Sequence, residues 1–292
     1  MVERLFNTSD GVGIHYRKIV PKDKRAALVF IHGYVIHSKY YKEVIERFGQ
    51  LGFLTLAPDL RGRGKSVIDD AKKLLATTTK RMVLDVRELL AHVSAEIGEL
   101  RVYLAGASYG ALVALRYTID YGGIAGIVMA GPPFGKINAM NFALLQLIAQ
   151  LNPKYKVPHA DVFDYLKTKD LSKDPTILLE PMRAGAILDI LNTIKLVEKD
   201  VGKLRVPMLM LYGTQDRLVT NNQISLIEKL KKGKDFTLES VEGMGHDMLD
   251  ESSMQECIRL FSEWLAKREH VSRAEFGKVE KKHNAATTNA GA

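Results

Sequence analysis

The chain has a single cysteine and no long apolar run, so neither disulfide bonds nor membrane-spanning segments are expected. Its 292 residues include a single cysteine, Cys257, which cannot form an internal disulfide and is expected to be a packing residue. No run approaches the ~20 apolar residues that a membrane-spanning helix needs. Residues 1–11 also lack the apolar core of a signal peptide. These absences favour a soluble, globular protein located in the cytoplasm.

Basic residues outnumber acidic ones and give a formal net charge of +8, so nucleic acid and anionic membranes must be considered as partners. The basic residues are scattered, and no patch alternates aromatic residues with arginines as a base-stacking surface would. We therefore expect no nucleic-acid partner. No Cys and His cluster suggests a metal site, and no Gly-x-Gly-x-x-Gly follows a strand, so neither a metal nor a cofactor is predicted.

Short apolar runs alternate with longer helical patterns, a rhythm typical of β-α units around a mostly parallel sheet. Before them, two runs that flank Ser9-Asp10-Gly11 indicate an antiparallel hairpin at a sheet edge. The predicted buried strands are Ala27–Ile31, Phe53–Ala57, Val102–Gly106, Ile124–Ala130, Met208–Tyr212 and Phe236–Val241. The predicted helices are Tyr40–Leu51, Thr79–Ile97, Gly110–Asp120 and a last helix with an apolar face from Cys257 to Leu265.

A long insertion interrupts this alternation. Roughly 75 residues separate the strand ending near Ala130 from the strand starting at Pro207, compared with ~10–15 in a simple crossover. Its first helical segment, Ile137–Leu151, is apolar around most of its circumference. It is therefore either a helix packed on two sides or a lid that lines an acyl pocket or meets a lipid surface. The predicted domains are a core of residues 1–134 and 204–268, a helical cap of residues 135–203 and a flexible tail of residues 269–292.

The sharpest local signal is Gly106-Ala107-Ser108-Tyr109-Gly110, between a predicted strand and a predicted helix. A tight turn at this place holds the serine in a strained backbone geometry that lifts its Oγ clear of the sheet. The flanking glycines let neighbouring backbone pass closely. Ser108 is therefore the predicted nucleophile, and the alternative is a serine that only caps a helix.

A serine hydroxyl needs a base within hydrogen-bond reach and a third group that orients this base. Asp216 follows the predicted strand 208–212, and His246 follows the predicted strand 236–241. Both loops lie where parallel sheets place their active sites. Ser108, Asp216 and His246 also occur in the chain order typical of serine hydrolases on this kind of sheet. We predict that these three residues form a catalytic triad.

A second turn supplies candidates for stabilising the transition state. Residues 30–34, Phe-Ile-His-Gly-Tyr, follow a buried strand, and their turn would bring the backbone N–H of Tyr34 beside that of Tyr109. Two such donors form an oxyanion hole, worth roughly 3–4 kcal/mol per donor. The alternative is a plain turn between a strand and a loop. His32 itself is not expected to be catalytic.

Together these motifs resemble the α/β-hydrolase superfamily, and within it the serine hydrolases similar to monoacylglycerol lipases, over roughly residues 10–268. The resemblance implies an α/β-hydrolase fold with a mostly parallel sheet and an inserted helical cap. It also implies hydrolysis of small-molecule or lipid acyl esters through an acyl-enzyme, without a cofactor. The motifs that carry it are His32-Gly33, His37-Ser38, the segment from Pro58 to Ser66, the Ser108 turn, Asp174-Pro175, the segment from Arg183 to Gly185, Asp216 and His246.

Gly62-Arg63-Gly64-Lys65-Ser66 also has the ending of a phosphate-binding loop. Such a loop needs a glycine where this chain has Asp59, so a nucleotide hydrolase is not expected. The resemblance implies instead that Asp59 and this turn organise a loop near the active site.

The chain departs from monoacylglycerol lipases where those enzymes commonly hold groups that hydrogen-bond a polar alcohol. A site without such groups does not favour a polar alcohol, so we expect a carboxylesterase of this family with a less polar leaving group. Transient contact of the cap with a membrane or micelle remains an expectation. The alternatives are lysophospholipase, thioesterase or amidase chemistry, or a non-catalytic binding protein. The departing positions are Tyr34, Val35, Ile36, Tyr40 and Ala107.

Overall fold

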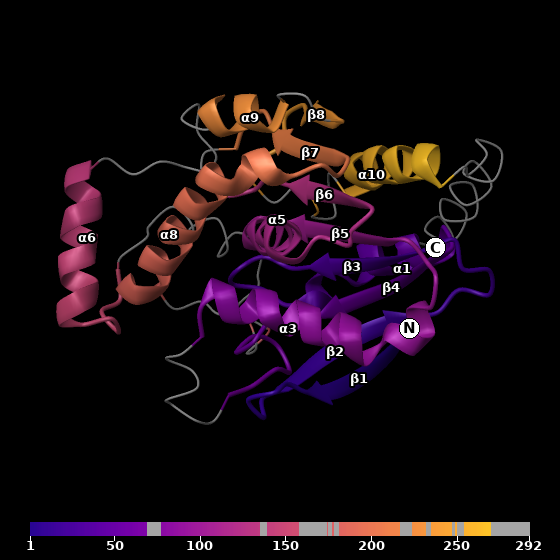
Figure 1. The fold of residues 1–292 in the computed structure, drawn as a ribbon, viewed down its shortest axis with the longest axis horizontal. Coiled ribbons are helices and arrows are strands. Elements are labelled where there is room, and N and C mark those ends of the chain that lie inside the picture. The colour runs from indigo at the N-terminus through magenta and orange to yellow at the C-terminus, as the bar shows by residue number, and fades with distance from the viewer. Residues whose placement is uncertain are drawn as a thin grey trace, which may run out of the picture.

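An eight-stranded sheet in the order β1-β2-β4-β3-β5-β6-β7-β8 runs through the molecule (Figure 1). The first two strands form the predicted hairpin, β2 pairs antiparallel with β4, and all later pairings are parallel. The strands are β1 Val2–Asn7, β2 Gly13–Ile19, β3 Ala26–Ile31, β4 Phe53–Pro58, β5 Val102–Ala107, β6 Gly126–Ala130, β7 Met208–Gly213 and β8 Phe236–Val241. The computed structural model describes residues 1–68, 77–134, 139–157, 174, 177, 181–216, 224–231, 235–246, 249 and 254–269.

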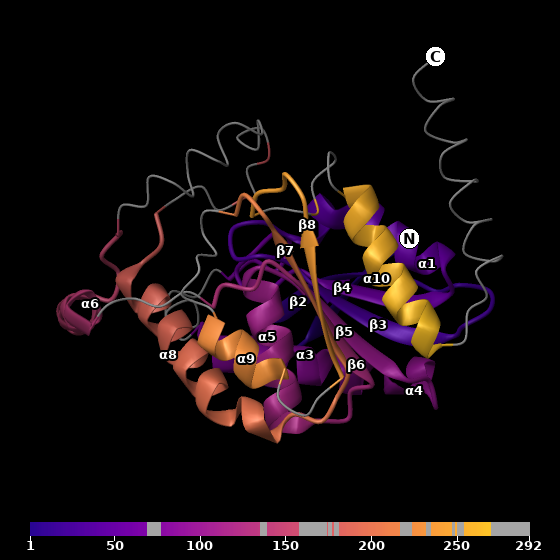
Figure 2. The ribbon, with the colours of Figure 1, turned by 90° about the horizontal axis from the view of Figure 1, so that it is seen from above.

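Helices cover both faces of the sheet (Figure 2). One face carries α1 and α10, and the other carries α3, α5, α8 and α9. This arrangement confirms the predicted α/β-hydrolase fold class. The helices are η1 Ser38–Tyr41, α1 Lys42–Gln50, α3 Thr79–His92, α4 Ser94–Ile97, α5 Tyr109–Tyr121, α6 Ala139–Leu151, α8 Ala184–Asp200, η3 Val201–Lys203, α9 Ile224–Lys231 and α10 Met254–Arg268.

The central strands are apolar along their whole length because both of their faces are covered. Every residue of β3 is buried, as the continuous run Ala-Ala-Leu-Val-Phe-Ile predicts for a parallel strand between two helical layers. Two apolar clusters result, one under α3, α5 and α8 and one under α1 and α10. Cys257 is fully buried in the second cluster, in keeping with its expected packing role.

The predicted helix Thr79–Ile97 is observed as two helices. The chain leaves helical geometry at Val93, where φ is −101° and ψ is 12°. The Val93 side chain is buried in the core, while its N–H still donates to Leu89 O at 3.0 Å. The interruption is therefore a local adjustment that seats one apolar side chain, and such an adjustment leaves no mark on hydrophobic periodicity.

Two α-helices and the short 3-10 helix η3 of the predicted cap fall within the described residues. Helix α8 packs on α5 through the buried side chains of Ile194 and Val197. Helix α6 packs on α8, where Leu145 and Ala149 meet Ala184, and it is the outermost helix in both views (Figures 1 and 2). No helix in the described part of the chain is long and apolar enough to cross a membrane. Residues 158–173 of the predicted cap and residues 270–292 of the predicted tail lie outside the described residues.

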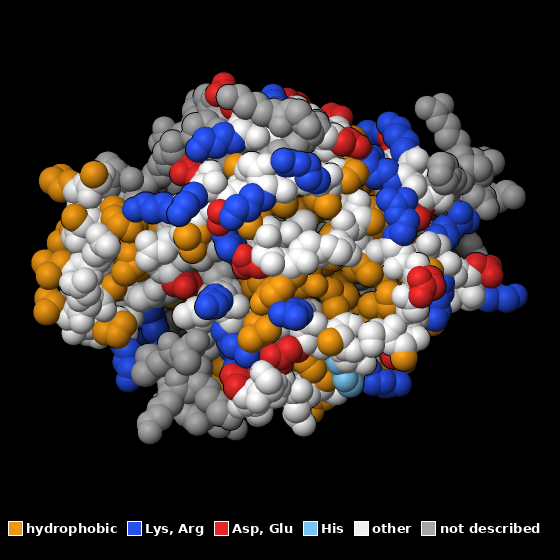
Figure 3. Space-filling view, viewed as in Figure 1, with side chains coloured by type: hydrophobic (Ala, Val, Ile, Leu, Met, Phe, Trp, Pro, Cys, Tyr) orange, Lys and Arg blue, Asp and Glu red, His pale blue; other side chains and the backbone are white. Residues whose placement is uncertain are grey.

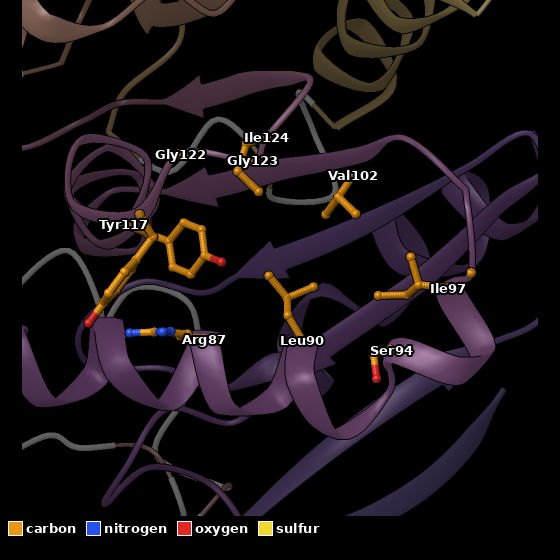
Figure 4. Close-up of a pocket in the computed structure, with 11 residues that line it drawn as sticks. Arg87, Leu90, Ser94, Ile97, Val102, Tyr117, Gly122, Gly123 and Ile124 are labelled. Atoms are coloured by element: carbon orange, nitrogen blue, oxygen red, sulfur yellow. The ribbon is translucent and has the colours of Figure 1, made fainter.

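A groove of 370 Å³ lies between α3 and α5 (Figure 4). Val102 and Ile124 in its lining mark the amino ends of β5 and β6, and Arg87 stacks on Tyr121 at 4.5 Å. Ser108 follows the opposite, carboxyl end of β5. The groove therefore contributes none of the residues predicted to be catalytic.

The turn after β5 requires its two glycines. A Cβ on Gly106 would lie 2.4 Å from the backbone of Gly110, and a Cβ on Gly110 would lie 2.0 Å from Ile31 O. Both contacts are with backbone, which cannot swing away as a side chain can. These glycines thus let the start of α5 approach the end of β3, and this approach positions the intervening Ser108.

We expect Gly110→Ala to destabilise the fold by more than about 3 kcal/mol, because its methyl group displaces backbone in the core. Urea unfolding followed by circular dichroism measures the change. Gly202→Ala is the matched control, since no atom lies within 4 Å of its added Cβ and it should be neutral or slightly stabilising. Equal midpoints for Gly110→Ala and the parent protein would contradict this account.

Candidate active site

Ser108 has the strained backbone that the sequence predicts. Its φ of 50° and ψ of −119° make it the one non-glycine residue with positive φ among the described residues. Its N–H donates to Ala130 O at the end of β6 at 2.8 Å. A side chain in this conformation costs on the order of 1–3 kcal/mol, which the surrounding packing must supply. The geometry raises the serine Oγ above the carboxyl edge of the sheet.

The three residues predicted as a triad lie within hydrogen-bond distance of one another. The His246 Nε2 to Ser108 Oγ distance is 2.8 Å, and the His246 Nδ1 to Asp216 Oδ2 distance is 2.9 Å. The Asp216 carboxylate can only accept, so Nδ1–H donates to it and the Nε2 lone pair faces the serine hydroxyl. The Asp216 side chain is 1% exposed and that of His246 is 17% exposed. This arrangement can take a proton from Ser108 and hold the resulting imidazolium against a carboxylate.

Contacts between two loops bring Asp216 and His246 together. Gln215 N–H donates to Met244 O at 2.8 Å, and Gly243 N–H donates to Thr214 Oγ1 at 2.9 Å. The end of β7 must be small here, because a Cβ on Gly213 would lie 2.3 Å from Met244 O. These hydrogen bonds fix the position of the Asp216 loop relative to the His246 loop.

Sequence reasoning missed Gly131 as part of the site. It follows β6 with φ +52°, and an added Cβ would lie 3.1 Å from His246 O and 3.7 Å from Asp216 Oδ2. A side chain at this position would therefore press on the Asp216–His246 pair. The available signal was Gly131-Pro132 at the end of a buried strand, the same kind of place that identified Ser108 and Asp216.

The two residues predicted to form the oxyanion hole are neighbours. The Tyr34 and Tyr109 rings meet edge to face with centroids 5.4 Å apart. An added Cβ on Gly33 would lie 3.7 Å from the Cβ of Ser108, so the loop after β3 runs directly beside the serine. Tyr109 is the first residue of α5, where backbone N–H groups have no partner inside the helix and the helix dipole favours negative charge.

Both ring nitrogens of His32 are held by backbone groups. It is fully buried, and Leu60 N–H donates to its Nε2 at 2.7 Å. Because Nε2 accepts, Nδ1 carries the proton and donates to Gly33 O at 2.7 Å. Burial lowers the pKa of His32 to about 4. A neutral imidazole thus fastens the loop of Tyr34 to the loop after β4.

Asp59 is the centre of the neighbouring loop. Its carboxylate accepts from the N–H of Ser38 and the N–H of Lys65, both at 2.9 Å, and lies 3.1 Å from His15 Nδ1. Burial alone would raise the pKa of Asp59, but hydrogen bonds from His15, Ser38 and Lys65 outweigh it and hold the pKa below its ordinary value. In the turn of residues 62–66, the Lys65 amide binds Asp59 and the amides of Gly62, Arg63 and Ser66 bind backbone carbonyls, so these groups are not available to a phosphate.

One contact links this region to the predicted cap. His37 Nε2 lies 3.1 Å from Asp174 Oδ2, although 137 residues separate them in sequence. The His37 side chain is 4% exposed and that of Asp174 is 30% exposed. Two motifs that carry the family resemblance therefore meet each other beside the Tyr34 loop.

A strained serine, a histidine and a buried aspartate at the carboxyl edge of this sheet define a serine hydrolase of the α/β-hydrolase fold. The sequence profile of the family described as "Serine aminopeptidase, S33" matches residues 22–253. The chain belongs to this family.

Known proteins agree with this assignment. The monoglyceride lipase of Homo sapiens is 28% identical over 248 residues, which cover 82% of this chain and 81% of the relative. The monoacylglycerol lipase of Mycolicibacterium smegmatis is 24% identical over 272 residues, or 90% of this chain and 96% of the relative. A carboxyl esterase structure from Bacillus coagulans superposes with a TM-score of 0.75 and 18% identity, covering 91% of this chain and 98% of the esterase.

The buried neutral state of His32 should make the protein less stable in acid. Unfolded His32 takes up a proton near pH 6.5, whereas folded His32 does so only near pH 4. The unfolded state therefore binds more protons in this window, and the free energy of unfolding falls as pH drops from 6.5 to 4, by up to roughly 3 kcal/mol from this group. Urea unfolding at several pH values should show a shallower decline for His32→Gln. Identical slopes for the two proteins would contradict the assignment.

Proposed function

We propose that this chain is a serine carboxylic ester hydrolase that works through an acyl-enzyme and resembles monoacylglycerol lipases. The observation that carries the proposal is the hydrogen-bonded series Ser108, His246, Asp216, with the serine held at φ 50°. The monoacylglycerol lipases and carboxyl esterase similar to this chain support the same chemistry.

In the proposed mechanism, Ser108 Oγ attacks the ester carbonyl carbon while His246 Nε2 takes its proton. Asp216 holds the imidazole in the required tautomer and stabilises the imidazolium. The backbone N–H groups of Tyr34 and Tyr109 receive the oxygen as it becomes negative. His246 then gives its proton to the departing alcohol, and a water molecule repeats the sequence on the acyl-enzyme.

The residues beside the proposed oxyanion loop support an ester with a weakly polar alcohol. Ile36 is buried, and Val35 and Tyr40 pack against the same apolar cluster under α1. Ala107, before the nucleophile, is also buried. None of the aliphatic side chains at positions 35, 36 and 107 can hydrogen-bond a glycerol hydroxyl. A monoacylglycerol would therefore give up hydrogen bonds to water that this site does not replace, whereas a simple alkyl or aryl ester would not.

We further propose that residues 135–203 form a cap whose helix α6 touches the lipid or micelle surface that holds the substrate. Helix α6 contains no charged residue, and Met140 and Leu151 are each more than three-quarters exposed. Leu144 and Leu147 are also exposed, and orange side chains dominate this end of the molecule in Figure 3. Four exposed, large apolar side chains on one uncharged helix suit contact with an apolar interface.

Ser108→Ala and His246→Ala should each lower kcat for p-nitrophenyl esters by about 10⁴-fold or more, because each removes a member of the triad. The exposed residues Ser94 and His92 provide matched controls, and Ser94→Ala and His92→Ala should keep normal rates. A fluorophosphonate probe should label the parent protein at Ser108 only. Normal turnover in the Ser108 variant, or folded protein inert to the probe, would overturn the proposed function.

The same assay tests the substrate preference with monoacylglycerols, thioesters and amides of matched acyl length. The highest kcat/KM should fall on the simple esters. A higher value for monoacylglycerols would contradict the argument from positions 35, 36 and 107, and a higher value for thioesters or amides would reassign the reaction.

The double variant Met140→Glu and Leu144→Glu should bind less than the parent protein to phosphatidylcholine–phosphatidylglycerol vesicles in a flotation assay. Two charges on α6 make insertion of its apolar face unfavourable. Leu5→Glu is the control, since Leu5 is 62% exposed on the edge strand β1, far from α6 (Figure 1). Equal vesicle binding by all three proteins would contradict a docking role for α6.

A further inference from the structure

A line of hydrogen bonds connects helix α8 with the residue that follows the nucleophile. Asp189 on α8 accepts from Thr79 Oγ1 at 2.6 Å and from Thr79 N–H at 2.7 Å. Thr79 Oγ1 lies 2.9 Å from the hydroxyl of Tyr109. Thr79 begins α3 and Tyr109 begins α5, so three helices meet at these side chains.

The chemistry of the groups decides which atom donates and which accepts in each of these hydrogen bonds. The Asp189 carboxylate can only accept, so the single hydroxyl proton of Thr79 is donated to it. The lone pairs of Thr79 Oγ1 then remain to accept the proton of the Tyr109 hydroxyl. Burial raises the pKa of Tyr109, which keeps this proton in place. Met82 Sδ, at 3.4 Å, is a weaker second acceptor for the same hydroxyl.

The other proposed oxyanion residue is held from its own side. Arg63 Nε donates to the carbonyl oxygen of Tyr34, and its guanidinium lies 4.4 Å from the centroid of the Tyr34 ring. The two sides of this arrangement meet at the edge-to-face contact between the Tyr34 and Tyr109 rings. One continuous set of contacts therefore runs from α8, through both tyrosine side chains, to the loop after β4.

We propose that Asp189 is a positioning residue that, through Thr79 and the phenol of Tyr109, fixes the two backbone N–H groups of the oxyanion hole. The proposal rests on the proposed function, because it concerns how that site stabilises its transition state. Each tyrosine supplies a backbone donor and uses its own side chain to hold this donor in place. Removing the Thr79 hydroxyl frees the Tyr109 ring and, through the ring contact, the Tyr34 loop.

Capping of α3 alone does not account for the arrangement. The helix has its own N-cap residue, Thr78, whose side chain accepts from Arg81 N–H at 3.2 Å. A cap would also need only the Asp189 bond to Thr79 N–H. The bond between the Thr79 hydroxyl and Tyr109 caps no backbone group of α3, and it leads directly to the residue after Ser108.

The test compares Thr79→Val with Thr79→Ser in the full chain. Thr79→Val keeps the side-chain shape and the backbone bond to Asp189 but has no hydroxyl. It should lower kcat by about 10- to 100-fold, part of the effect of losing an oxyanion donor, with KM nearly unchanged. Asp189→Asn should lower kcat in the same direction. Thr79→Ser retains the hydroxyl and should retain most of the activity.

A transition-state analogue gives the readout that a purely structural role would not change. An alkyl trifluoromethyl ketone is attacked by Ser108 Oγ, the serine proton passes to His246, and the ketone oxygen becomes the bound oxyanion. Its inhibition constant should weaken in Thr79→Val by the same factor as kcat. Inhibition by the matching alcohol, which forms no oxyanion, should not change.

Thr118→Val is the matched control, since Thr118 is a buried threonine on α5 whose hydroxyl donates to Ala114 O. It should keep both kcat and analogue affinity. If the parent protein hydrolyses esters through Ser108 while Thr79→Val matches it in kcat and analogue affinity, the positioning role is wrong and the proposed function stands. Equal losses in Thr79→Ser and Thr79→Val would also overturn it, because the hydroxyl would then be irrelevant. An inactive parent protein would reject the proposed function itself.

Discussion

The backbone of Ser108 is the constraint on which the rest of the site depends. A side chain at φ 50° persists only where its surroundings leave no alternative. The surroundings here are the backbone of α5 pressed against the end of β3, and this approach is open only to glycine at positions 106 and 110. The core under α5 therefore helps to shape the proposed active site, since its packing supplies the free energy that holds the serine in its strained conformation.

Two buried ionisable side chains near this strained turn, His32 and Asp59, each have hydrogen-bond partners that favour one protonation state. His32 is neutral because burial disfavours its charge and both of its ring nitrogens have fixed partners. Asp59 is charged because several donors converge on it. Two loops that flank the nucleophile are thus fixed by groups that do not titrate near neutral pH. Among the described histidines, His246 is the one that joins a buried carboxylate to the Ser108 hydroxyl.

The parts of the site that sequence could predict are those marked by strand ends. Parallel strands deliver their carboxyl ends to one edge, so Ser108, Asp216 and His246 follow from reading where β5, β7 and β8 stop. Gly131 lies at an equivalent strand end and was accessible by the same rule. Asp189 was not, because it lies inside a helix with no periodic or motif signal. Its role depends on α8 crossing the start of α3, and hydrophobic patterns do not encode the angle between two helices.

Helix α8 packs against two different neighbours, the core helix α5 and the outer helix α6. Its later turns are locked into the core by Ile194 and Val197, and Arg116 on α5 pairs with Asp200 at 3.0 Å. Asp189 lies in the first half of α8, between Leu188 and Leu191, which pack against the cluster that contains Leu145 and Ala149 of α6. The contact with α6 and the proposed positioning residue therefore share one stretch of α8, ahead of the turns that the core holds. Packing against α6 on one side and against α5 on the other thus holds the stretch of α8 from which Asp189 reaches Thr79.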